Sequence, residues 1–562
     1  MLDLACFPHG LQQIQSAIQE HALNRVVIGA CSNRTHDSLF QKTVRAAGLN
    51  PYLLEVVNLQ EQCNRVHRWQ SEQANRKAHE MLRMAVGRVS LAKPVYKEKH
   101  VCRSAALVIG GGVAGMTAAL AIADSGYEVH LVERSEMLGG NLLNLYYVAE
   151  GYNPQRLLRD LVNRVRAHTR IQVYTRTEVA RHRGHVGDFR SDLRTILPDG
   201  KIITTEVRHG VTIVATGGQE AHQHPWLKLP AVVTQRELEE MIIHEPQKVA
   251  EWKNVVMIQC VGKEGMAEYC SRVCCTNTMK NALRLRLFNP ACQVIVLHRN
   301  IVTYGFREKY YTEARQRGVI FARWSDECPP QVLWDEVSQK PLVRVRDLAL
   351  NRWLEVQADV VPLSVSVVPA EGSETLARKL RVPLSSEGFF EEAQLKLRPM
   401  DFMREGIFLA GMAAYPKFIE ESISHALAAA GRALTLLTQK SLYLGGVVAY
   451  VDPQKCVGCL TCTRTCPFGI PQVIQPSEWI EMSGEQSANS FYADLPSRHQ
   501  QPRTGVGGLG GAAFIDPAQC QGCGTCTGEC PANAIQLIHY TDEQMMLRHI
   551  RGLGEWLIES IH

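Results

Sequence analysis

Residues 456–467 read Cys456-Val-Gly-Cys459-Leu-Thr-Cys462-Thr-Arg-Thr-Cys466-Pro467, and residues 520–531 repeat the pattern as Cys520-Gln-Gly-Cys523-Gly-Thr-Cys526-Thr-Gly-Glu-Cys530-Pro531. This C-x2-C-x2-C-x3-C-P spacing is typical of domains that bind two [4Fe–4S] clusters. In such domains the first three thiolates of a run bind one cluster and the fourth binds the other. The predicted ligand sets are therefore Cys456, Cys459, Cys462 and Cys530 for one cluster, and Cys520, Cys523, Cys526 and Cys466 for the other. Because these clusters exchange single electrons, the repeat predicts electron transfer.

A structural zinc site and a disulfide framework are the alternative interpretations of this repeat. Zinc sites use two C-x2-C pairs or mixtures of cysteine and histidine, whereas here four closely spaced cysteines end in proline. The chain has 18 cysteines, and its first ten residues lack the basic stretch and following apolar stretch of a secretory signal. Such cysteine usage predicts a reducing cytoplasm and metal binding rather than disulfides.

Length and charge narrow the class of protein. A chain of 562 residues is too long for one core and predicts roughly three or four domains. The formal net charge of +5 is small for this length and argues against nucleic-acid binding. No apolar run approaches the roughly 18 residues that cross a bilayer, so no membrane span is expected.

A glycine motif, Gly110-Gly-Gly112-Val-Ala-Gly115, lies between a predicted strand at 106–110 and a predicted helix at 115–125. Gly110 would permit the tight turn, Gly112 would let the backbone approach a pyrophosphate, and Gly115 would let helix and strand pack closely. Glu133 ends the next predicted strand and could accept hydrogen bonds from both ribose hydroxyls. This βαβ context predicts a dinucleotide site with the pyrophosphate at the helix N-terminus.

Three later segments favour FAD over NAD: Gly139-Gly140-Asn141, the strand ending in Thr216-Gly217-Gly218, and the strand ending in Gly411-Met412. Each alone is compatible with an ordinary strand end. Together they resemble the FAD contacts of flavoproteins with two dinucleotide-binding domains, such as thioredoxin reductase. Arg134 and Val179 complete the predicted contacts. An Asp commonly occupies the position of Met412 in that family, so the ribityl contact departs from the family pattern here.

Lys417 is the candidate catalytic residue. It precedes a helix predicted from about Ile419 to Leu437, and the same resemblance implies that this helix points its N-terminus at the pyrimidine end of the flavin. A positive helix end there stabilises reduced anionic flavin. Lys417 could reach the ring, and the alternative is a solvated surface lysine.

A second group of cysteines stands where the resemblance to thioredoxin reductase would place a nicotinamide site. The predicted strand Asn254-Val-Val-Met-Ile-Gln-Cys260 leads into a loop with Cys270, Cys274 and Cys275 rather than into a glycine motif. Adjacent cysteines would form a strained disulfide, but as thiolates they can bind two irons of one cluster. We expect a [4Fe–4S] cluster here, with buried or redox-active thiols as the alternative. This loop argues against NAD(P)H binding.

Four segments together resemble the A-type subunit of heterodisulfide reductase and its bacterial relatives: residues 259–275, 27–36 and 61–63, and Pro416-Lys417. The resemblance implies FAD, several [4Fe–4S] clusters and electron transfer between partner subunits, which in some complexes splits electron pairs between two acceptors. The chain lacks the second ferredoxin-type pair that longer forms carry between Gly218 and Lys253, and its N-terminus is short. Fewer clusters provide fewer routes by which electrons can leave the protein, so simple electron transfer is favoured over bifurcation.

Three further cysteines match the family's N-terminal cysteines: Cys6, Cys31 and Cys63. A cluster there needs a fourth ligand, for which Cys102 is the best remaining candidate. Structural cysteines are the alternative. Cys292 and Cys328 are expected to be buried thiols.

The predicted fold class is α/β. Residues 1–98 form a cysteine-containing α/β domain, and residues 99–445 form a thioredoxin-reductase-like FAD-binding Rossmann domain with a [4Fe–4S] insert around 254–300. Residues 446–540 form an α+β two-cluster ferredoxin domain in which 477–513 is a polar surface loop. Residues 541–562 form a C-terminal helix that packs on its own chain or contacts a neighbouring protein of the complex.

We therefore expect a cytoplasmic FAD and iron–sulfur oxidoreductase subunit of a heterodisulfide-reductase-like complex. Its expected partners are the other subunits and a ferredoxin, hydrogenase or dehydrogenase as electron donor, with a homodimer inside the larger assembly. One alternative is a self-contained NAD(P)H:ferredoxin-type flavin oxidoreductase. Another is an electron-transfer module whose flavin site is vestigial.

Overall fold

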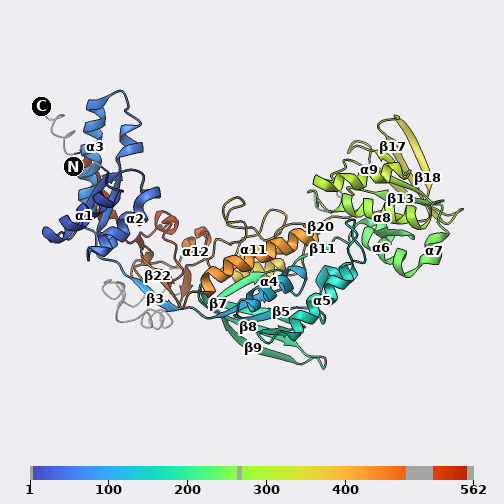
Figure 1. Cartoon of the computed structure of the whole chain (residues 1–562), viewed down its shortest axis with the longest axis horizontal. Helices are drawn as coiled ribbons and strands as arrows, with labels where there is room; N and C mark the ends of the chain where they lie inside the picture. The colour runs from blue at the N-terminus through green and yellow to red at the C-terminus, as the bar shows by residue number, and fades with distance from the viewer. Residues whose placement is uncertain (1–3, 262–268, 476–510, 554–562) are drawn as a thin grey trace. The chain divides into compact units, whose positions relative to one another are not determined.

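The computed structural model describes residues 4–261, 269–475 and 511–553. The chain divides into two compact units, Met1–Lys99 with Tyr443–His562, and His100–Leu442. The N-terminal and ferredoxin-like parts of the sequence thus belong to one unit. Figure 1 labels the elements along the chain.

The N-terminal part of the first unit is a small α/β layer. Two parallel strands, β1 (Val26–Ala30) and β2 (Leu54–Asn58), pair with Val26 opposite Leu54. Their apolar faces pack against a core that includes Phe40 and Val44. The helices of this part are α1 (Pro8–Glu20), α2 (Asn33–Ala46), η1 (Pro51–Leu53), η2 (Gln60–Asn64) and α3 (Ser71–Ser90).

The ferredoxin-like part repeats one strand and helix arrangement. Strand β23 (Ala449–Val451) pairs antiparallel with β26 (Ile535–Leu537), and β24 (Gln472–Ile474) pairs antiparallel with β25 (Ala512–Phe514). Each cysteine run continues into a short helix, α12 (Thr461–Thr465) or α14 (Thr525–Gly528). The predicted surface loop at 477–513 lies outside the described residues except for its last three positions, 511–513, of which 512 and 513 belong to β25.

The C-terminal helix α15 (Asp542–Leu553) packs against α3 of the same unit. The Gln544 side chain donates to the carbonyl of Leu91, and His539 bonds the carbonyl of Lys93. These contacts favour the interpretation that the helix packs on its own chain. The predicted helix beyond residue 553 lies outside the described residues.

The second unit begins with a five-stranded parallel sheet in the order β21-β10-β4-β5-β6. All five residues of β4 are buried, as expected for a parallel strand covered on both faces. Helices α4 and α11 pack together through small residues, including Ala118 and Ala429. The elements are β4 (Ala105–Ile109), α4 (Val113–Asp124), β5 (Glu128–Val132), α5 (Pro154–Ala167), β6 (Ile171–Tyr174), β10 (Val211–Val214), β21 (Ile407–Leu409) and α11 (Ile419–Leu437).

A second parallel sheet, in the order β12-β19-β13-β14-β15, forms another lobe of this unit. Its strands are β12 (Val232–Thr234), β13 (Asn254–Ile258), β14 (Gln293–His298), β15 (Ile320–Arg323) and β19 (Val361–Leu363). Its helices are α6 (Gln235–His244), α7 (Pro246–Ala250), α8 (Cys274–Phe288) and α9 (Glu308–Gln316). The chain passes twice between the two parallel sheets. These two connections contain strands β11 (Gly218–Glu220) and β20 (Val367–Pro369), which pair with each other. Two sheets of this type agree with the predicted pair of dinucleotide-binding folds.

Two three-stranded antiparallel sheets accompany the parallel sheets. They are β7 (Thr177–His185), β8 (Asp188–Ile196) and β9 (Ile202–His209), and β16 (Gln331–Asp335), β17 (Lys340–Asp347) and β18 (Arg352–Gln357). The remaining elements are β3 (Lys97–Val101), η3 (Gly140–Asn144), η4 (Pro225–Lys228), η5 (Gly305–Arg307), α10 (Ser373–Leu380), η6 (Gly411–Ala413) and β22 (Ser441–Gly445). The charged residues 97–100 belong to strand β3, in which exposed and partly buried positions alternate.

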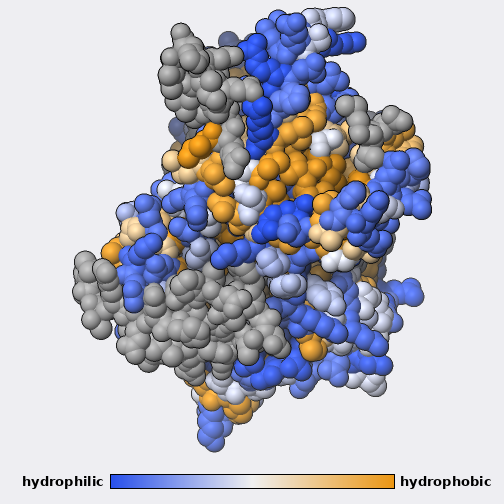
Figure 2. Space-filling view, turned by 90° about the vertical axis from the view of Figure 1, so that its left-hand side faces the viewer, coloured by the Kyte–Doolittle hydropathy of each residue, from blue (hydrophilic) through white to orange (hydrophobic). Residues whose placement is uncertain are grey.

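Apolar side chains occur on the surface as well as in the cores. On the face in Figure 2 they gather in a patch within a largely hydrophilic surface. In the first unit, the large exposed apolar side chains include Phe7 (55% exposed), Val66 (64%) and Trp69 (87%). Within the described residues, no helix has both the length and the apolar character needed to cross a membrane.

Candidate functional site

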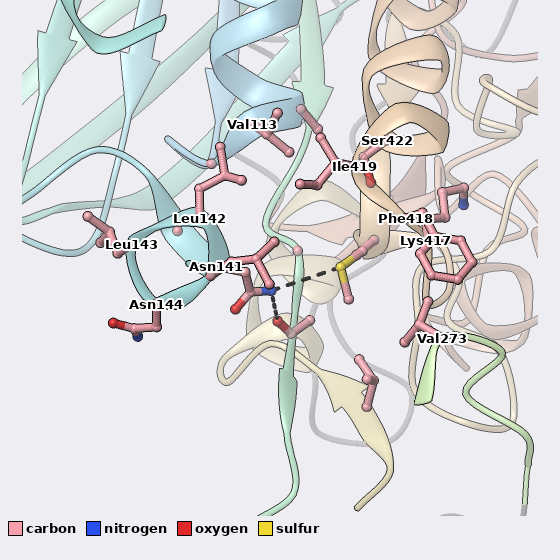
Figure 3. Close-up of a pocket in the computed structure, with 18 of the residues that line it drawn as sticks. Val113, Asn141, Leu142, Leu143, Asn144, Val273, Lys417, Phe418, Ile419 and Ser422 are labelled. Atoms are coloured by element: carbon pink, nitrogen blue, oxygen red, sulfur yellow. Dashed lines mark hydrogen bonds between the residues drawn. The ribbon is translucent and has the colours of Figure 1, made fainter. Parts of the chain in front are cut away.

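A cavity of about 450 Å³ lies in the second unit. The loop from Gly139 to Asn144 lines one side, and the first turn of α11 lines another, as Figure 3 shows. The carboxyl ends of β4, β5 and β10 open into the same space through Gly110, Glu133 and Thr216. This is the edge of a parallel sheet at which ligands bind in open α/β folds.

The glycine motif has the geometry that a dinucleotide site needs. Gly110 has φ of +114°, and a Cβ there would lie 2.2 Å from the carbonyl oxygen of Ala215. A Cβ on Gly115 would lie 1.8 Å from the carbonyl oxygen of Gly110, so only glycine permits this contact between α4 and the turn. At Gly112, in contrast, the nearest protein atom would be 4.0 Å away, which leaves that position open toward the cavity.

Glu133 is buried at the end of β5 and is held by the backbone. Its Oε2 accepts from Gly111 N–H (2.6 Å), and its Oε1 accepts from the N–H and hydroxyl of Ser135 (2.8 Å each). An ionised carboxylate has about four acceptor positions, so capacity for a ribose hydroxyl remains. The neighbouring Arg134 donates to the carbonyl of Glu371 across the mouth of the cavity.

The Asn141 side chain, labelled in Figure 3, contacts Met412. The Asn141 Nδ2 donates to the carbonyl of Gly218 (2.8 Å) and lies 3.9 Å from the Met412 sulfur. A thioether offers only a weak acceptor. The departure from Asp at this position therefore changes a charged contact into a nearly apolar one.

Most of the predicted flavin contacts line this cavity: Gly110, Gly112, Glu133, Arg134, Gly140, Asn141, Thr216, Gly217, Met412 and Lys417. Gly115, Val179 and Gly411 do not. Val179 is 3% exposed, packs in the neighbouring core, and accepts from Lys379 through its carbonyl. The role of all these residues as flavin contacts, whether or not they line the cavity, remains a prediction.

Lys417 is buried on the cavity wall, so the alternative of a solvated surface lysine is wrong. Among the residues that the structure describes, its Nζ has no hydrogen-bond partner, and it lies 3.0 Å from the centre of the Tyr415 ring. Burial lowers the pKa of Lys417 from 10.5 to about 7, an effect that Glu421 opposes and Arg272 reinforces. Near neutral pH the amine can therefore change charge at the flavin end of the cavity.

Other unpartnered polar atoms on the wall indicate that the cavity fits a polar ligand. Thr216 Oγ1, Gln235 Nε2 and Thr276 Oγ1 are buried and have no hydrogen-bond partner in the described part of the chain, and all three residues line the cavity. Buried polar atoms are normally hydrogen-bonded in folded proteins. A dinucleotide carries the hydroxyls, phosphates and ring heteroatoms that could satisfy them, so the residues present fit FAD.

The second lobe contributes a wall of the cavity that was not predicted from the sequence. Gln235 and Glu239 come from α6, and Thr276 and Lys280 come from α8. Lys280 donates to Glu239 Oε2 (2.6 Å), and both side chains are nearly inaccessible. Lys280 also donates to the carbonyl of Tyr147, which ties this wall to the first lobe. The sequence around these residues contains no motif that predicts this wall. The one signal is that Thr276 directly follows Cys275, which is a predicted cluster ligand.

The eight ferredoxin-type cysteines gather in two separate cavities. Cys456, Cys459, Cys462 and Cys530 line one of them, and Cys466, Cys520, Cys523 and Cys526 line the other. Each cavity therefore combines three cysteines of one run with the fourth of the other, the exchange that the spacing predicts. Within the described residues, no three His, Cys, Asp or Glu side chains could hold a single metal ion, whereas a cubane takes one thiolate per iron.

Backbone N–H groups point at sulfur in equivalent places of the two copies. Ala513 N–H donates to Cys456 Sγ (3.3 Å), and Ala449 N–H donates to Cys520 Sγ (3.5 Å). Such bonds stabilise thiolates and tune cluster potentials. Apolar side chains form much of the remaining walls, among them Ile470 and Ile535, while Gln521 and Thr461 are polar. The donor set and its surroundings fit [4Fe–4S] clusters.

The cysteines of the second lobe also lie together. Cys260 follows β13 with φ of +59°, and Cys274 and Cys275 begin α8. A hydrogen bond from Cys274 lowers the pKa of the Cys275 thiol to about 7, and Val302 N–H supports the same direction at 3.4 Å from its sulfur. The hydrogen bond with Cys275 and burial raise the pKa of Cys274, and Cys260 and Cys270 lie close enough to raise it further. These four thiols fit the ligand set of one cluster, while part of the loop, 262–268, lies outside the described residues.

The N-terminal cysteines lie on or next to different elements. Cys31 follows β1, and Cys63 lies in η2 after β2, where its thiol donates to the carbonyl of Ala74. Cys6 precedes α1. Cys102 belongs to the second unit and is buried with its thiol donating to the carbonyl of Leu436 (3.5 Å). A cluster shared by these four residues remains a prediction.

Comparisons with known proteins agree with the two kinds of site. Residues 455–537 match the family described as 4Fe-4S dicluster domain, and residues 106–202 match FAD dependent oxidoreductase. A thioredoxin reductase of Lactococcus lactis of known structure is 17% identical, with 60% of this chain and 99% of that chain covered and a TM-score of 0.42.

Relatives that are similar along most of the chain belong to heterodisulfide reductases. A CoB–CoM heterodisulfide reductase iron-sulfur subunit of the A type from Methanopyrus kandleri is 30% identical over 84% of this chain and 85% of its own length. The A-type subunit of the H₂:CoB–CoM heterodisulfide,ferredoxin reductase of Methanothermobacter thermautotrophicus is 31% identical over 83% of this chain and 84% of its own. With an FAD-dependent oxidoreductase segment, a two-cluster [4Fe–4S] segment and these relatives, the chain belongs to the family of A-type subunits of heterodisulfide reductases, which are oxidoreductases.

Proposed function

We propose that this chain is the flavin-bearing electron-transfer subunit of a heterodisulfide-reductase-like complex, with FAD in the cavity, two [4Fe–4S] clusters in the ferredoxin-like part and a third cluster in the cysteine loop of the second lobe. When bound, FAD exchanges electrons in pairs and the clusters exchange them singly. A fourth cluster on the N-terminal cysteines is not needed for this function.

One observation carries the proposal. Helix α8 begins with Cys274 and Cys275, and its next residues, Thr276 and Asn277, line the flavin cavity. The proposed cluster ligands and the proposed flavin wall are therefore neighbours on a single helical turn. This arrangement supports the proposal, because a cluster and a flavin bound there would lie at the short separation that electron transfer needs. The sequence after β13 also offers cysteines rather than a glycine motif for a nicotinamide.

The chain's own residues hold and tune the flavin in this proposal. Glu133 accepts from the adenosine ribose, and the N–H groups at the start of α4 face the pyrophosphate. Lys417 provides a positive charge or a proton donor at the flavin end, and the positive end of the α11 dipole adds to it. Because the pKa of Lys417 is lowered to about 7, its charge would respond to negative charge on a nearby flavin.

Partner proteins supply and remove the electrons. The names of two relatives include a ferredoxin reductase activity and a ferredoxin/F420H₂-dependent activity, which supports a multi-subunit complex with such donors or acceptors. Exposed apolar side chains such as Phe7 and Trp69 are candidates for contacts between subunits, since large exposed apolar patches usually mark interaction sites. A homodimer in a reducing cytoplasm completes the proposal.

Anaerobic purification with flavin, iron and sulfide counting tests this function. We expect roughly one FAD and three clusters per chain. Stopped-flow mixing with NADH should leave the flavin oxidised in the isolated chain. Rapid bleaching of the flavin by NADH would instead support the self-contained oxidoreductase, and colourless protein would refute the proposal altogether.

A further inference from the structure

The last part of the cysteine loop, Tyr269–Arg272, is bonded to elements far away in the sequence. The Tyr269 hydroxyl donates to the carbonyl of Val367 (2.7 Å), and Val367 N–H donates to the Ser271 hydroxyl (2.9 Å). Val367 begins β20, one of the two strands that connect the lobes. These two bonds fix the loop to the lobe connection immediately before Cys274.

Arg272 extends the same loop to the flavin end of the cavity. Its Nη1 donates to the carbonyl of Pro416 (3.1 Å), and its Nη2 donates to Tyr304 Oη (2.8 Å) and to Glu421 Oε1 (3.1 Å). The guanidinium also lies over the rings of Tyr304 and Tyr415. A single side chain thus contacts the residue before Lys417, the first turn of α11 and the ring beside Lys417.

The groups around Arg272 are organised to receive it. Tyr304 Oη donates to Glu421 Oε1 (2.9 Å), while Glu421 Oε2 accepts from Phe418 N–H (2.9 Å) and so caps α11. Burial, together with Glu421, raises the pKa of Tyr304 to about 12, so its hydroxyl keeps the proton that it donates. Arg272 itself has φ of +62°, a conformation that costs free energy in a residue other than glycine and persists only where surrounding contacts compensate.

We infer that Arg272 is a positioning residue that locks the cysteine loop to the N-terminal end of α11, and so fixes the separation between the loop cluster and the flavin. The inference rests on the proposed function and adds the side chain that sets this geometry. The planar guanidinium donates from two separate nitrogens while it lies over the rings of Tyr304 and Tyr415, an arrangement that the single nitrogen of an ammonium group cannot reproduce. The role is therefore specific to arginine rather than to positive charge.

Hydrogen exchange of the cofactor-loaded full chain tests the inference in four variants: Arg272→Met, Arg272→Lys, Glu421→Gln and Arg317→Met. Arg272→Met should raise exchange in peptides covering 269–275 and 416–422 by about tenfold or more, as expected for losing charge-assisted hydrogen bonds. Arg272→Lys should do the same. Arg317→Met removes an exposed ion pair with Glu313 elsewhere in the lobe and should leave both peptides unchanged.

A second readout follows the cofactors. Freeze-quench spectroscopy after rapid reduction should show electron exchange between flavin and loop cluster slowed by about tenfold or more in Arg272→Met and Arg272→Lys, within the range found when residues that support a metal site are removed. If Arg272→Met does not fold, Glu421→Gln decides, because Gln keeps an oxygen for Phe418 N–H while the ion pair is lost. It should reproduce the rise in exchange at 416–422.

The outcomes separate the two proposals. Wild-type protein without flavin or iron refutes the proposed function. Wild-type protein with both cofactors, combined with normal exchange and normal electron transfer in Arg272→Met, refutes only the inference. Restoration of both properties by Arg272→Lys also refutes it, since charge alone would then suffice.

Discussion

The two cysteine-rich regions of this protein are built in opposite ways. In the ferredoxin-like part, all eight cysteines belong to two runs whose own residues form most of the cavity walls. In the second lobe, Cys260 follows a strand, Cys274 and Cys275 begin a helix, and the end of the loop between them is held by Val367 and Glu421. The first region is a local motif, whereas the second depends on tertiary contacts.

The two cysteine-rich regions also differ in the groups that surround their thiols. Apolar side chains and backbone N–H groups surround the ferredoxin-type cysteines. In the loop of the second lobe, the Arg299 side chain lies close to Cys260, and the backbone N–H of Arg272 donates to Cys270 Sγ (3.4 Å). The positive charge of Arg299 would raise the potential of a cluster in the loop relative to a similar cluster among apolar residues.

The largest expected effect is the loss of a whole cluster. It tests whether the fourth cysteine of each run binds the cluster held by the other run. Cys530→Ala should remove the cluster that Cys456, Cys459 and Cys462 share, and Cys466→Ala should remove the other. Each variant should lose about one cluster's worth of iron and sulfide per flavin, and electron paramagnetic resonance should show a different cluster missing in each. Identical spectra of the two variants would contradict the exchange of the fourth cysteine.

Cys275→Ala addresses the region that depends on tertiary contacts. We expect iron to fall by about one cluster while the flavin is retained, because the Cys₄ ligand set is broken. Cys292→Ala is the matched control: this buried thiol lies in the same lobe, and burial raises its pKa to about 11, so it remains protonated. Equal iron content in the two variants would remove the loop cluster from the proposal.

Lys280→Met tests, through thermal stability, how far the second lobe depends on tertiary contacts. It leaves the Glu239 carboxylate buried without its cation, which costs about 3–5 kcal/mol. Thermal denaturation should show a large loss, and iron should leave the loop cluster before the ferredoxin-type clusters because α8 carries two of the loop ligands.

Lys248→Met is the control for this variant. It removes an exposed ion pair with Glu245 and should cost less than about 1 kcal/mol. A similar melting temperature in the two variants would mean that the pair of Lys280 and Glu239 does not stabilise α8.

Lys417→Met has the smallest expected effect, and that effect depends on pH. The folded protein has a pKa of about 7 at Lys417 against 10.5 for the ordinary side chain, so between these values the unfolded chain binds more protons there. The contribution of Lys417 to stability therefore rises with pH across this window and is most unfavourable below pH 7.

In flavin-free protein, Lys417→Met should consequently raise the melting temperature more at pH 6.5 than at pH 9.5. Melting curves of the variant and the wild type at both values measure the difference. A gain that is the same at both values would show that the amine is not titrating at a lowered pKa.

Local spacing was enough to predict much of this protein. The exchange of Cys466 and Cys530 between the two cavities follows from the number of residues between cysteines, and helix α11 forms over the predicted residues Ile419–Leu437. The contact of Gly115 with the carbonyl of Gly110 lies within one turn of the chain. Patterns of this kind span about a dozen residues, and they are visible in the sequence.

Tertiary structure alone decided which distant residues complete the sites. Arg272 and Glu421 are 149 positions apart, and Lys280 and Glu239 are 41 apart, yet each pair forms a hydrogen-bonded ion pair at the cavity or beside it. A charged residue in a sequence reads as solvated surface until folding removes its water and supplies a partner. Burial and pairing of this kind are properties of the packed lobes, which is why the sequence pointed to Lys417 but could not show that it is buried and that its pKa is lowered to about 7.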